Sequence, residues 1–336
     1  MATFIEEQAT TTMKAFVRER YGSPEVLELR EREKPEPAED ELLVRVRAFS
    51  PNPVDWHELT GMPYLVRLLQ GLRRPKDIRL GGDFAGTVEA VGANVDGFRP
   101  GDEVFGVRHA AFGEYITVPQ DRAVVPKPAG ASFEQAAVCG VAALTALQGL
   151  RDKGELKPGE KVLVNGASGG VGTFAVQMAR ALGAAEVAGV CNADKVEQAR
   201  ALGADPVIDY TREDFTRRGE RYDVIVDIGG THSWSACRRA LTKHGRLVCV
   251  SGPKTNRVFG PLGRMISGKL GSVRCSQEFV PFIAKPVKED MEIIAAMLAE
   301  GSVIPVIERT YGLDELPEAM AYLGEGHARG KLVVTI

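Results

Sequence analysis

The sequence predicts a two-domain α/β protein, in which a barrel-like region of short strands precedes a doubly wound parallel sheet. At 336 residues the chain is too long for one average hydrophobic core. From Met13 to about residue 128, short strand-like runs are separated by proline and glycine, which is typical of an all-β barrel. Beyond residue 131, strand-like and helix-like segments alternate. That alternation indicates βαβ units and a parallel sheet.

The opening region follows a polar, threonine-rich tail, residues 1–12, which we expect to be frayed. Its short strands, separated by proline and glycine, indicate a barrel-like region. The strand-like runs are 13–19, 42–50, 86–91, 98–107, 113–119 and 123–128.

The parallel-sheet region opens with a helix over 132–150, where Ser132 and Gln135 have the spacing of a capping box. The continuous apolar run 161–167 then suits a strand buried on both faces. The later segments are a helix 171–184, a strand 186–191, a helix 193–204, strands 206–210 and 222–230, a helix 233–245, a strand 246–252 and a helix 288–301. We expect the final short strands, 306–312 and 331–336, to return to the barrel.

Composition excludes several classes of protein. The apolar fraction of 44% and the charged fraction of 26% are those of a globular chain. A net charge of −3 gives no general case for binding nucleic acid or an anionic membrane, so any basic site must be local. The chain has no membrane-spanning apolar run and no signal-peptide pattern, so we expect a cytoplasmic protein without membrane insertion.

The five cysteines are an odd number and never form a CxxC pair, which argues against a zinc finger or a disulfide framework. We interpret them as small buried residues. They are Cys139, Cys191, Cys237, Cys249 and Cys275.

The most informative segment is a glycine-rich turn between the predicted strand 161–167 and the following helix. Its motif runs Ala167, Ser168, Gly169, Gly170, Val171 and Gly172. A side chain at Gly169 would block a pyrophosphate from the backbone, and Gly172 would let the helix pack closely on the strand. The free N–H groups at the helix start favour an anion. This order of strand, turn and helix predicts a dinucleotide site.

The end of the second parallel strand indicates which dinucleotide binds. That strand ends in Cys191 and Asn192, so no acid stands where NAD-preferring sites bond the ribose 2′-hydroxyl. Lys195 follows and could bond a 2′-phosphate. Asp194 is an acid close to this strand end and would argue for NAD, but we expect it to cap the next helix. The sequence therefore favours NADPH, with a solvated helix position as the alternative for Lys195.

Read together, these motifs resemble the medium-chain dehydrogenase/reductase superfamily, and within it the zinc-free quinone oxidoreductase branch of zeta-crystallin-like and enone reductases. The matching elements, in the family's order, are SPNPVDW at 50–56, GGDFAGTVEAVG at 81–92, GDEVFG at 101–106, GEYITVP at 113–119, NGASGGVG at 165–172, LGADPVIDY at 202–210 and the closing GKLVV. A short-chain dehydrogenase is the rival, but no tyrosine here is followed by a lysine four residues later.

The resemblance implies a GroES-like barrel domain, residues 13–130 and 285–336, and a Rossmann NADPH-binding domain, residues 131–284. It also implies a homodimer. The strand-like segment 271–279 could pair with its copy across a two-fold axis, or be an ordinary edge strand.

The positions that hold catalytic zinc in related alcohol dehydrogenases differ in this chain. Asn52 stands near the first cysteine position, Asp83 follows two glycines where those enzymes have a histidine and a glutamate, and only Cys139 could match the last ligand. One thiolate falls short of the three protein ligands that a catalytic zinc needs. We therefore expect no metal. We also expect Asp83 to pair with a cation of the returning segment, Lys331 or Arg329.

Four residues near the predicted nicotinamide are candidates for catalysis. By the resemblance, Asn52 would contact the nicotinamide ribose or the substrate. His57 takes the place of an active-site tyrosine and could donate to the substrate oxygen, while Asp55 could orient His57 or cap a short helix. Tyr64 is a second candidate donor, and the helical segment 64–75 that it opens could line or cover the pocket.

Further cofactor contacts are expected where parallel strands end, the edge at which α/β sheets bind ligands. Thr145 and Tyr210 match family positions beside the nicotinamide and the adenosine phosphate, and Lys331 belongs to the same set. The strand ends contribute Gly229, Ser251 and Gly252.

We therefore expect an NADPH-dependent reductase that transfers hydride to a quinone or an α,β-unsaturated carbonyl, since such acceptors need no Lewis acid. The alternatives are a zinc-independent alcohol dehydrogenase, an enoyl-thioester reductase, and an NADPH-binding structural or regulatory protein with little turnover.

Overall fold

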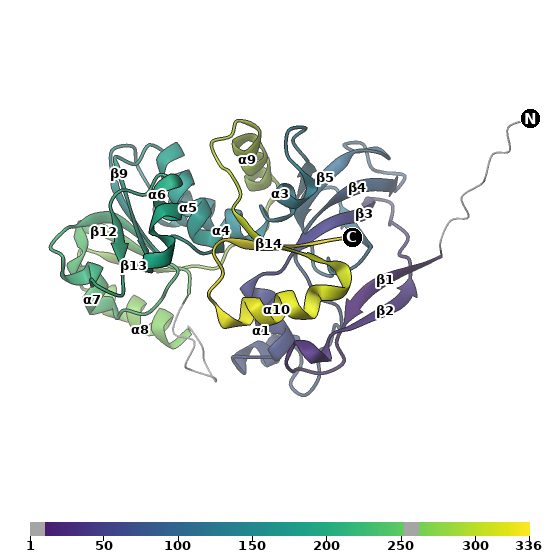
Figure 1. Cartoon of the computed structure of the whole chain (residues 1–336), viewed down its shortest axis with the longest axis horizontal. Coiled ribbons are helices and arrows are strands. Elements are labelled where there is room, and N and C mark those ends of the chain that lie inside the picture. Colours follow the sequence, from purple (N-terminus) through teal and green to yellow (C-terminus); the bar gives the residue numbers. More distant parts are fainter. Residues whose placement is uncertain (1–10, 252–261) are drawn as a thin grey trace, which may run out of the picture.

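The computed structural model describes residues 11–251 and 262–336, and it has two lobes (Figure 1). One lobe is built on a six-stranded sheet and the other on a seven-stranded sheet. The expected α/β class is therefore confirmed. No helix in the described ranges is long and apolar enough to cross a bilayer.

The six-stranded sheet is parallel throughout, with strand order β10-β9-β8-β11-β12-β13. The order reverses between β8 and β11, which places a ligand-binding edge at their carboxyl ends. The strands are β8 (Lys161–Asn165), β9 (Glu186–Cys191), β10 (Val207–Asp209), β11 (Tyr222–Asp227), β12 (Leu241–Cys249) and β13 (Glu278–Pro281). The helices of this lobe are α5 (Gly170–Ala181), α6 (Val196–Ala201), α7 (Trp234–Arg239) and α8 (Leu262–Ser272).

The seven-stranded sheet has the order β14-β15-β3-β4-β5-β7, with β6 paired to β3. Its strands are β3 (Glu41–Ser50), β4 (Asp83–Val91), β5 (Glu103–Val107), β6 (Tyr115–Pro119), β7 (Val124–Pro126), β14 (Ile307–Gly312) and β15 (Lys331–Thr335), and a separate hairpin pairs β1 (Thr12–Val17) with β2 (Glu28–Glu33). Because β15 pairs antiparallel with β3, the expected return of the last strands to the barrel is confirmed.

The remaining helices connect or flank the two sheets. They are α1 (Pro53–Thr60), α2 (Leu65–Gln70), α3 (Phe133–Ala137), α4 (Val141–Gln148), α9 (Lys288–Ala299) and α10 (Leu316–Glu325). Figure 1 shows α1 and α10 together at one side of the molecule.

The helix expected over 132–150 is interrupted, and this corrects the sequence prediction. Its capping box is present, since Ser132 and Gln135 bond each other's backbone N–H. The break falls at Gly140, where an added Cβ would lie 2.2 Å from Asp83 Oδ1. The next N–H, of Val141, donates to the same oxygen at 2.8 Å. A buried carboxylate therefore separates α3 from α4.

Two other predicted segments change type along their length. The helix expected over 233–245 ends at Arg239, because Leu241 already pairs with Tyr222 in the parallel sheet. The strand-like segment 271–279 is largely helix and turn, with the strand beginning only at Glu278.

Candidate active site and cofactor cleft

The glycine-rich turn after β8 has the geometry of a phosphate loop. Gly166 makes the turn with φ at +100°. An added Cβ at Gly172 would lie 2.0 Å from the Gly166 carbonyl oxygen, so α5 packs directly on the turn. At Gly169 the nearest atom to an added Cβ is 3.7 Å away, so that side is open. The first N–H groups of α5, beginning with Gly170 and Val171, lack acceptors within their helix. The loop therefore fits a pyrophosphate.

Lys331 brings the other lobe against this loop. An added Cβ at Gly170 would lie 3.0 Å from Lys331 Cδ, so the lysine stem of β15 runs beside the first turn of α5. Ala167 and Ser168 are buried behind the loop. The phosphate loop and the start of β15 thus lie directly against each other.

The end of β9 places three of the predicted cofactor residues together. Cys191 is buried, and the Asn192 Oδ1 atom is buried without a hydrogen-bond partner among the described residues. Lys195 Nζ donates to the carbonyl oxygen of His327 at 2.7 Å, and burial lowers its pKa. It also donates to the Ala328 carbonyl oxygen at 3.5 Å, and because an ammonium has three N–H donors, one remains for a phosphate oxygen. Tyr210 is 58% exposed beside them.

Asp194 does not cap the next helix as expected. It lies within a 3₁₀ turn over Ala193–Lys195, and the residue at the N-cap of α6 is Lys195, without a side-chain cap. The N-cap position falls one residue later because the short 3₁₀ turn lies between β9 and α6.

Asp83 lies at the start of β4 and is fully buried. Its Oδ2 accepts from Asn52 Nδ2 at 2.9 Å and lies 3.6 Å from Lys331 Nζ, while its Oδ1 accepts from the Val141 N–H. Lys331 also donates to Asn52 Oδ1. Burial raises the pKa of Asp83, and the Lys331 ammonium opposes that rise. The expected pairing with Lys331 is confirmed; Arg329 contacts Glu308 through its backbone N–H instead.

Asp55 caps α1, which is one of the two roles that the sequence left open. Its Oδ2 accepts from the Asn52 N–H at 2.7 Å, in a capping box with the Asn52 side chain. Burial raises the pKa of Asp55 to about 8, and the Asn52 hydrogen bond opposes that rise. Asn52 is therefore held between two buried carboxyl groups.

His57 lies on α1, and Tyr64 is the residue just before α2. His57 Nδ1 lies 2.7 Å from the Met62 carbonyl oxygen. Tyr64 is 48% exposed, and its ring lies under the Arg67 guanidinium, 5.0 Å from centroid to Cζ. Either ring could meet a ligand that enters beside α1.

Three further predicted contacts lie on α4 and just after β11 and β12. Thr145 is 7% exposed and donates to the Val141 carbonyl oxygen within α4. Gly229 packs on Asn165, with 3.0 Å from an added Cβ to Nδ2. Ser251 follows β12, whereas Gly252 lies outside the described residues.

Comparison with known proteins gives this arrangement a family. Residues 38–129 match the model described as alcohol dehydrogenase GroES-like domain, and residues 202–334 match the model described as zinc-binding dehydrogenase. The chloroplast envelope quinone oxidoreductase homolog of Arabidopsis thaliana is 33% identical, over 89% of this chain and 91% of that protein. The chain belongs to the quinone oxidoreductase branch of the medium-chain dehydrogenase/reductase superfamily.

Other relatives and solved structures agree with that assignment. The 2-methylene-furan-3-one reductase of Solanum lycopersicum is 31% identical, over 96% of this chain and 79% of that protein. The quinone oxidoreductase of Coxiella burnetii superposes with a TM-score of 0.83 at 29% identity, covering 97% and 99% of the two chains. The Escherichia coli quinone oxidoreductase complexed with NADPH gives 0.81 at 27% identity, covering 96% and 100%.

In this branch member, the positions equivalent to zinc ligands are committed to other contacts. Asn52 and Asp83 bond each other, and the Lys331 cation lies between them. The Cys139 thiol is buried and donates to the Gln135 carbonyl oxygen, and its burial raises its pKa. Residues 11–251 and 262–336 contain no group of three histidine, cysteine or acidic side chains placed to hold a metal. The donor set does not fit zinc.

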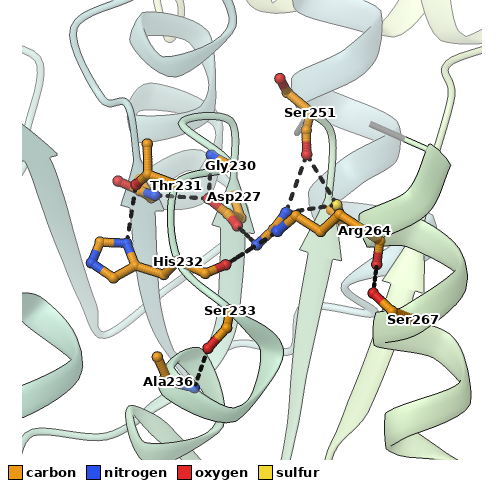
Figure 2. Close-up of polar contacts among 11 residues, drawn as sticks. Asp227, Gly230, Thr231, His232, Ser233, Ala236, Ser251, Arg264 and Ser267 are labelled. Carbon is orange, nitrogen blue, oxygen red and sulfur yellow. Dashed lines mark hydrogen bonds and ion pairs between the residues drawn. The ribbon is translucent and has the colours of Figure 1, made fainter. Parts of the chain in front are cut away.

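Sequence reasoning missed a polar cluster at the carboxyl end of β11 (Figure 2). Asp227 is fully buried, forms an ion pair with Arg264 of α8, and accepts from Asn165 Nδ2 at 2.7 Å. Arg264 also donates to the carbonyl oxygens of His232 and Ser251, at 3.0 and 3.1 Å. The sequence contains a signal for this cluster. Asp227 ends a buried parallel strand shortly before two glycines, and an acid in that position lies at the ligand-binding edge.

A pocket of about 260 Å³ lies beside this cluster. Its lining includes His232 and Trp234 from the turn after β11 and Arg264 and Ser267 from α8. The ion pair between Asp227 and Arg264 therefore fixes α8 at the edge of the parallel sheet and shapes one wall of the pocket.

Proposed function

We propose that this protein is an NADPH-dependent reductase that transfers hydride to a quinone or an α,β-unsaturated carbonyl without zinc. The observation that carries the proposal is the Asn52–Asp83–Lys331 network, which replaces a zinc-ligand set with a cation and hydrogen-bond donors. When bound, the cofactor would supply the hydride. Names of relatives support the class, since they include quinone oxidoreductases and an enone reductase.

The chain's own residues would bind and orient the reactants. The phosphate loop, from Ala167 to Val171, would hold the pyrophosphate through its N–H groups, with Lys331 alongside. At the end of β9, Lys195 would bind the 2′-phosphate beside Asn192. We include Thr145, Tyr210 and the strand-end residues in the same cleft as proposals.

The substrate oxygen would meet hydrogen-bond donors from the α1 region. His57 is the first candidate, since imidazole titrates near neutrality and can supply a proton. Tyr64 is the second. His57→Phe should lower kcat and leave NADPH affinity nearly unchanged, and equal turnover would exclude His57.

The proposed reaction is tested by following NADPH oxidation at 340 nm across quinones, enones and enoyl thioesters, with NADH in parallel. We expect consumption with quinones or enones and a preference for NADPH. Tight NADPH binding without consumption of any acceptor would favour a structural or regulatory protein instead.

An alcohol dehydrogenase is the second candidate, because a solved structure named as an NAD-dependent alcohol dehydrogenase is 28% identical with a TM-score of 0.81. The test is reduction of NAD or NADP by simple alcohols, which the lead proposal expects to be negligible.

We also propose the domain division at residues 13–130 with 285–336, and 131–284. A homodimer could form across β13, which is an edge strand of its sheet and precedes Ile283, an 81% exposed side chain. Sedimentation velocity would test the dimer. A cytoplasmic location is part of the proposal and is testable by cell fractionation.

A further inference from the structure

The surface helix α2 exposes leucine side chains and turns polar side chains toward the protein. A surface helix normally buries its apolar side and exposes its polar side. Here Leu68 and Leu69 are 61% and 80% exposed. Arg67 turns inward, where its Nε donates to the Gly61 carbonyl oxygen at 3.0 Å and its guanidinium covers the Tyr21 ring.

Gln70 also faces the protein, since its Nε2 donates to Glu58 Oε1 at 2.9 Å. The two polar side chains thereby fix the rotation of the helix about its axis. Leu68 and Leu69 cannot turn inward without breaking the bonds of Arg67 and Gln70. The outward leucines are therefore built into the fold of this segment.

A basic loop folds back directly onto the end of this helix. The Lys76 N–H donates to the Gln70 carbonyl oxygen at 2.7 Å. Between them, Leu72 is 68% exposed, and the side chains of Arg73 and Arg74 are exposed as well. Over residues 64–79 the sequence has five basic residues and one acid, in a chain of net charge −3.

We call these exposed residues the α2 patch: Leu68, Leu69, Leu72, Arg73, Arg74 and Lys76. We propose that the α2 patch docks this protein reversibly on an anionic phospholipid surface. Exposed leucines next to clustered arginine and lysine are the combination that inserts shallowly among lipids and attracts their phosphates.

The charge of the patch decides among its possible occupants. A second copy of this chain would bring an identical basic patch to the same face, and like charges would repel. Nucleic acid would attract the basic side chains but offers no apolar partner for three leucines. An anionic bilayer satisfies both kinds of side chain.

This inference does not depend on the proposed reaction, because lipid binding needs neither cofactor nor substrate. The full chain is mixed with phosphatidylcholine vesicles with or without phosphatidylglycerol, and the bound fraction is measured by co-sedimentation. We expect binding only with phosphatidylglycerol, and weaker binding as salt rises.

Two variants test the two halves of the patch. Leu68→Ser with Leu69→Ser should abolish most of the vesicle binding. Arg73→Glu, Arg74→Glu and Lys76→Glu together should weaken it more than about 100-fold, at about fivefold for each basic residue. Because these side chains are exposed, thermal melting should barely change.

Control variants carry changes of the same kind elsewhere, with one leucine replaced instead of two. Leu270→Ser alters a 68% exposed leucine of α8. The triple change Arg99→Glu, Arg122→Glu and Arg217→Glu reverses three side chains that are 87%, 68% and 78% exposed. Both controls should keep most of the vesicle binding.

Three results would overturn the proposal. The first is absence of binding to anionic vesicles, and the second is equal loss in the controls. The third is unchanged vesicle binding with a smaller sedimenting mass in the leucine variant, which would assign the patch to a second copy.

Discussion

The two lobes each bury an aspartate at the end of a central strand, and they neutralise it differently. Asp227, in the parallel sheet, has one guanidinium, Arg264, as its cation. Asp83, in the barrel, pairs with the Lys331 ammonium and accepts from Asn52, whose backbone N–H donates to a second buried acid, Asp55. The first site therefore has one acid and one cation, whereas the second has two buried acids and one cation. Burial is the main reason that the pKa of Asp55 is raised, and the neighbouring Asp83 carboxylate raises it further.

The largest expected effects on the free energy of unfolding come from replacing Asp227 or Asp83. Asp227→Ala should destabilise the fold by about 3–5 kcal/mol, because it leaves a buried guanidinium unpaired. Asp83→Ala should cost less, since Asp55 can ionise and pair electrostatically with Lys331. Urea unfolding of both variants measures the difference. Equal losses would show that Asp55 does not compensate.

The excess proton predicts a pH effect at the Asp83 site. Because the folded pKa of Asp55 is about 8 and the unfolded pKa is near 4, the folded state binds the extra proton between those values. Stability from this group is therefore complete below about pH 4 and is lost as pH rises toward 8.

Asp55→Asn removes that dependence. The free energy of unfolding of the variant, minus that of the wild type, should rise by about 2–4 kcal/mol from pH 4 to pH 7. Urea melts at several pH values measure it. A difference that stays flat with pH would mean that Asp55 is ionised throughout.

Glycines packed against the two networks give a smaller effect. An alanine at Gly140 would place Cβ 2.2 Å from Asp83 Oδ1, whereas at Gly229 it would lie 3.0 Å from Asn165 Nδ2. We expect Gly140→Ala to cost about 1–3 kcal/mol from overpacking, and Gly229→Ala to cost less. Gly130→Ala is the control, because nothing lies within 4 Å of its Cβ.

The smallest expected effect comes from replacing Lys195, which also contacts the other lobe through His327. Lys195→Ala should weaken NADPH binding about tenfold through loss of a charge-assisted bond. Binding of NADH should change little, and fluorescence titration measures both. Equal loss for the two cofactors would assign Lys195 to its contact with the His327 carbonyl oxygen instead.

Local chemistry made the cofactor side of this protein predictable from the sequence. The phosphate loop needs particular residues at fixed short spacings, so Ala167, Gly169 and Gly172 reveal it within a few residues. Helix ends were harder: the helix from Ser132 ends at Ala137, and the next helix starts where the Val141 N–H donates to Asp83 from the barrel. No propensity of the segment itself announces that contact.

By itself, the sequence determined the α/β class, the family and the glycine geometry of the cofactor loop, because each can be read from local patterns and short motifs along the chain. It also supported a pairing of Asp83 with Lys331, once the last strand was expected to return to the barrel. Only the tertiary structure decided that Asp55 is buried beside Asn52, that Arg264 neutralises Asp227, and that Leu68 and Leu69 face outward. Those outcomes depend on which distant segments meet, and burial then sets the cost of each unpaired charge.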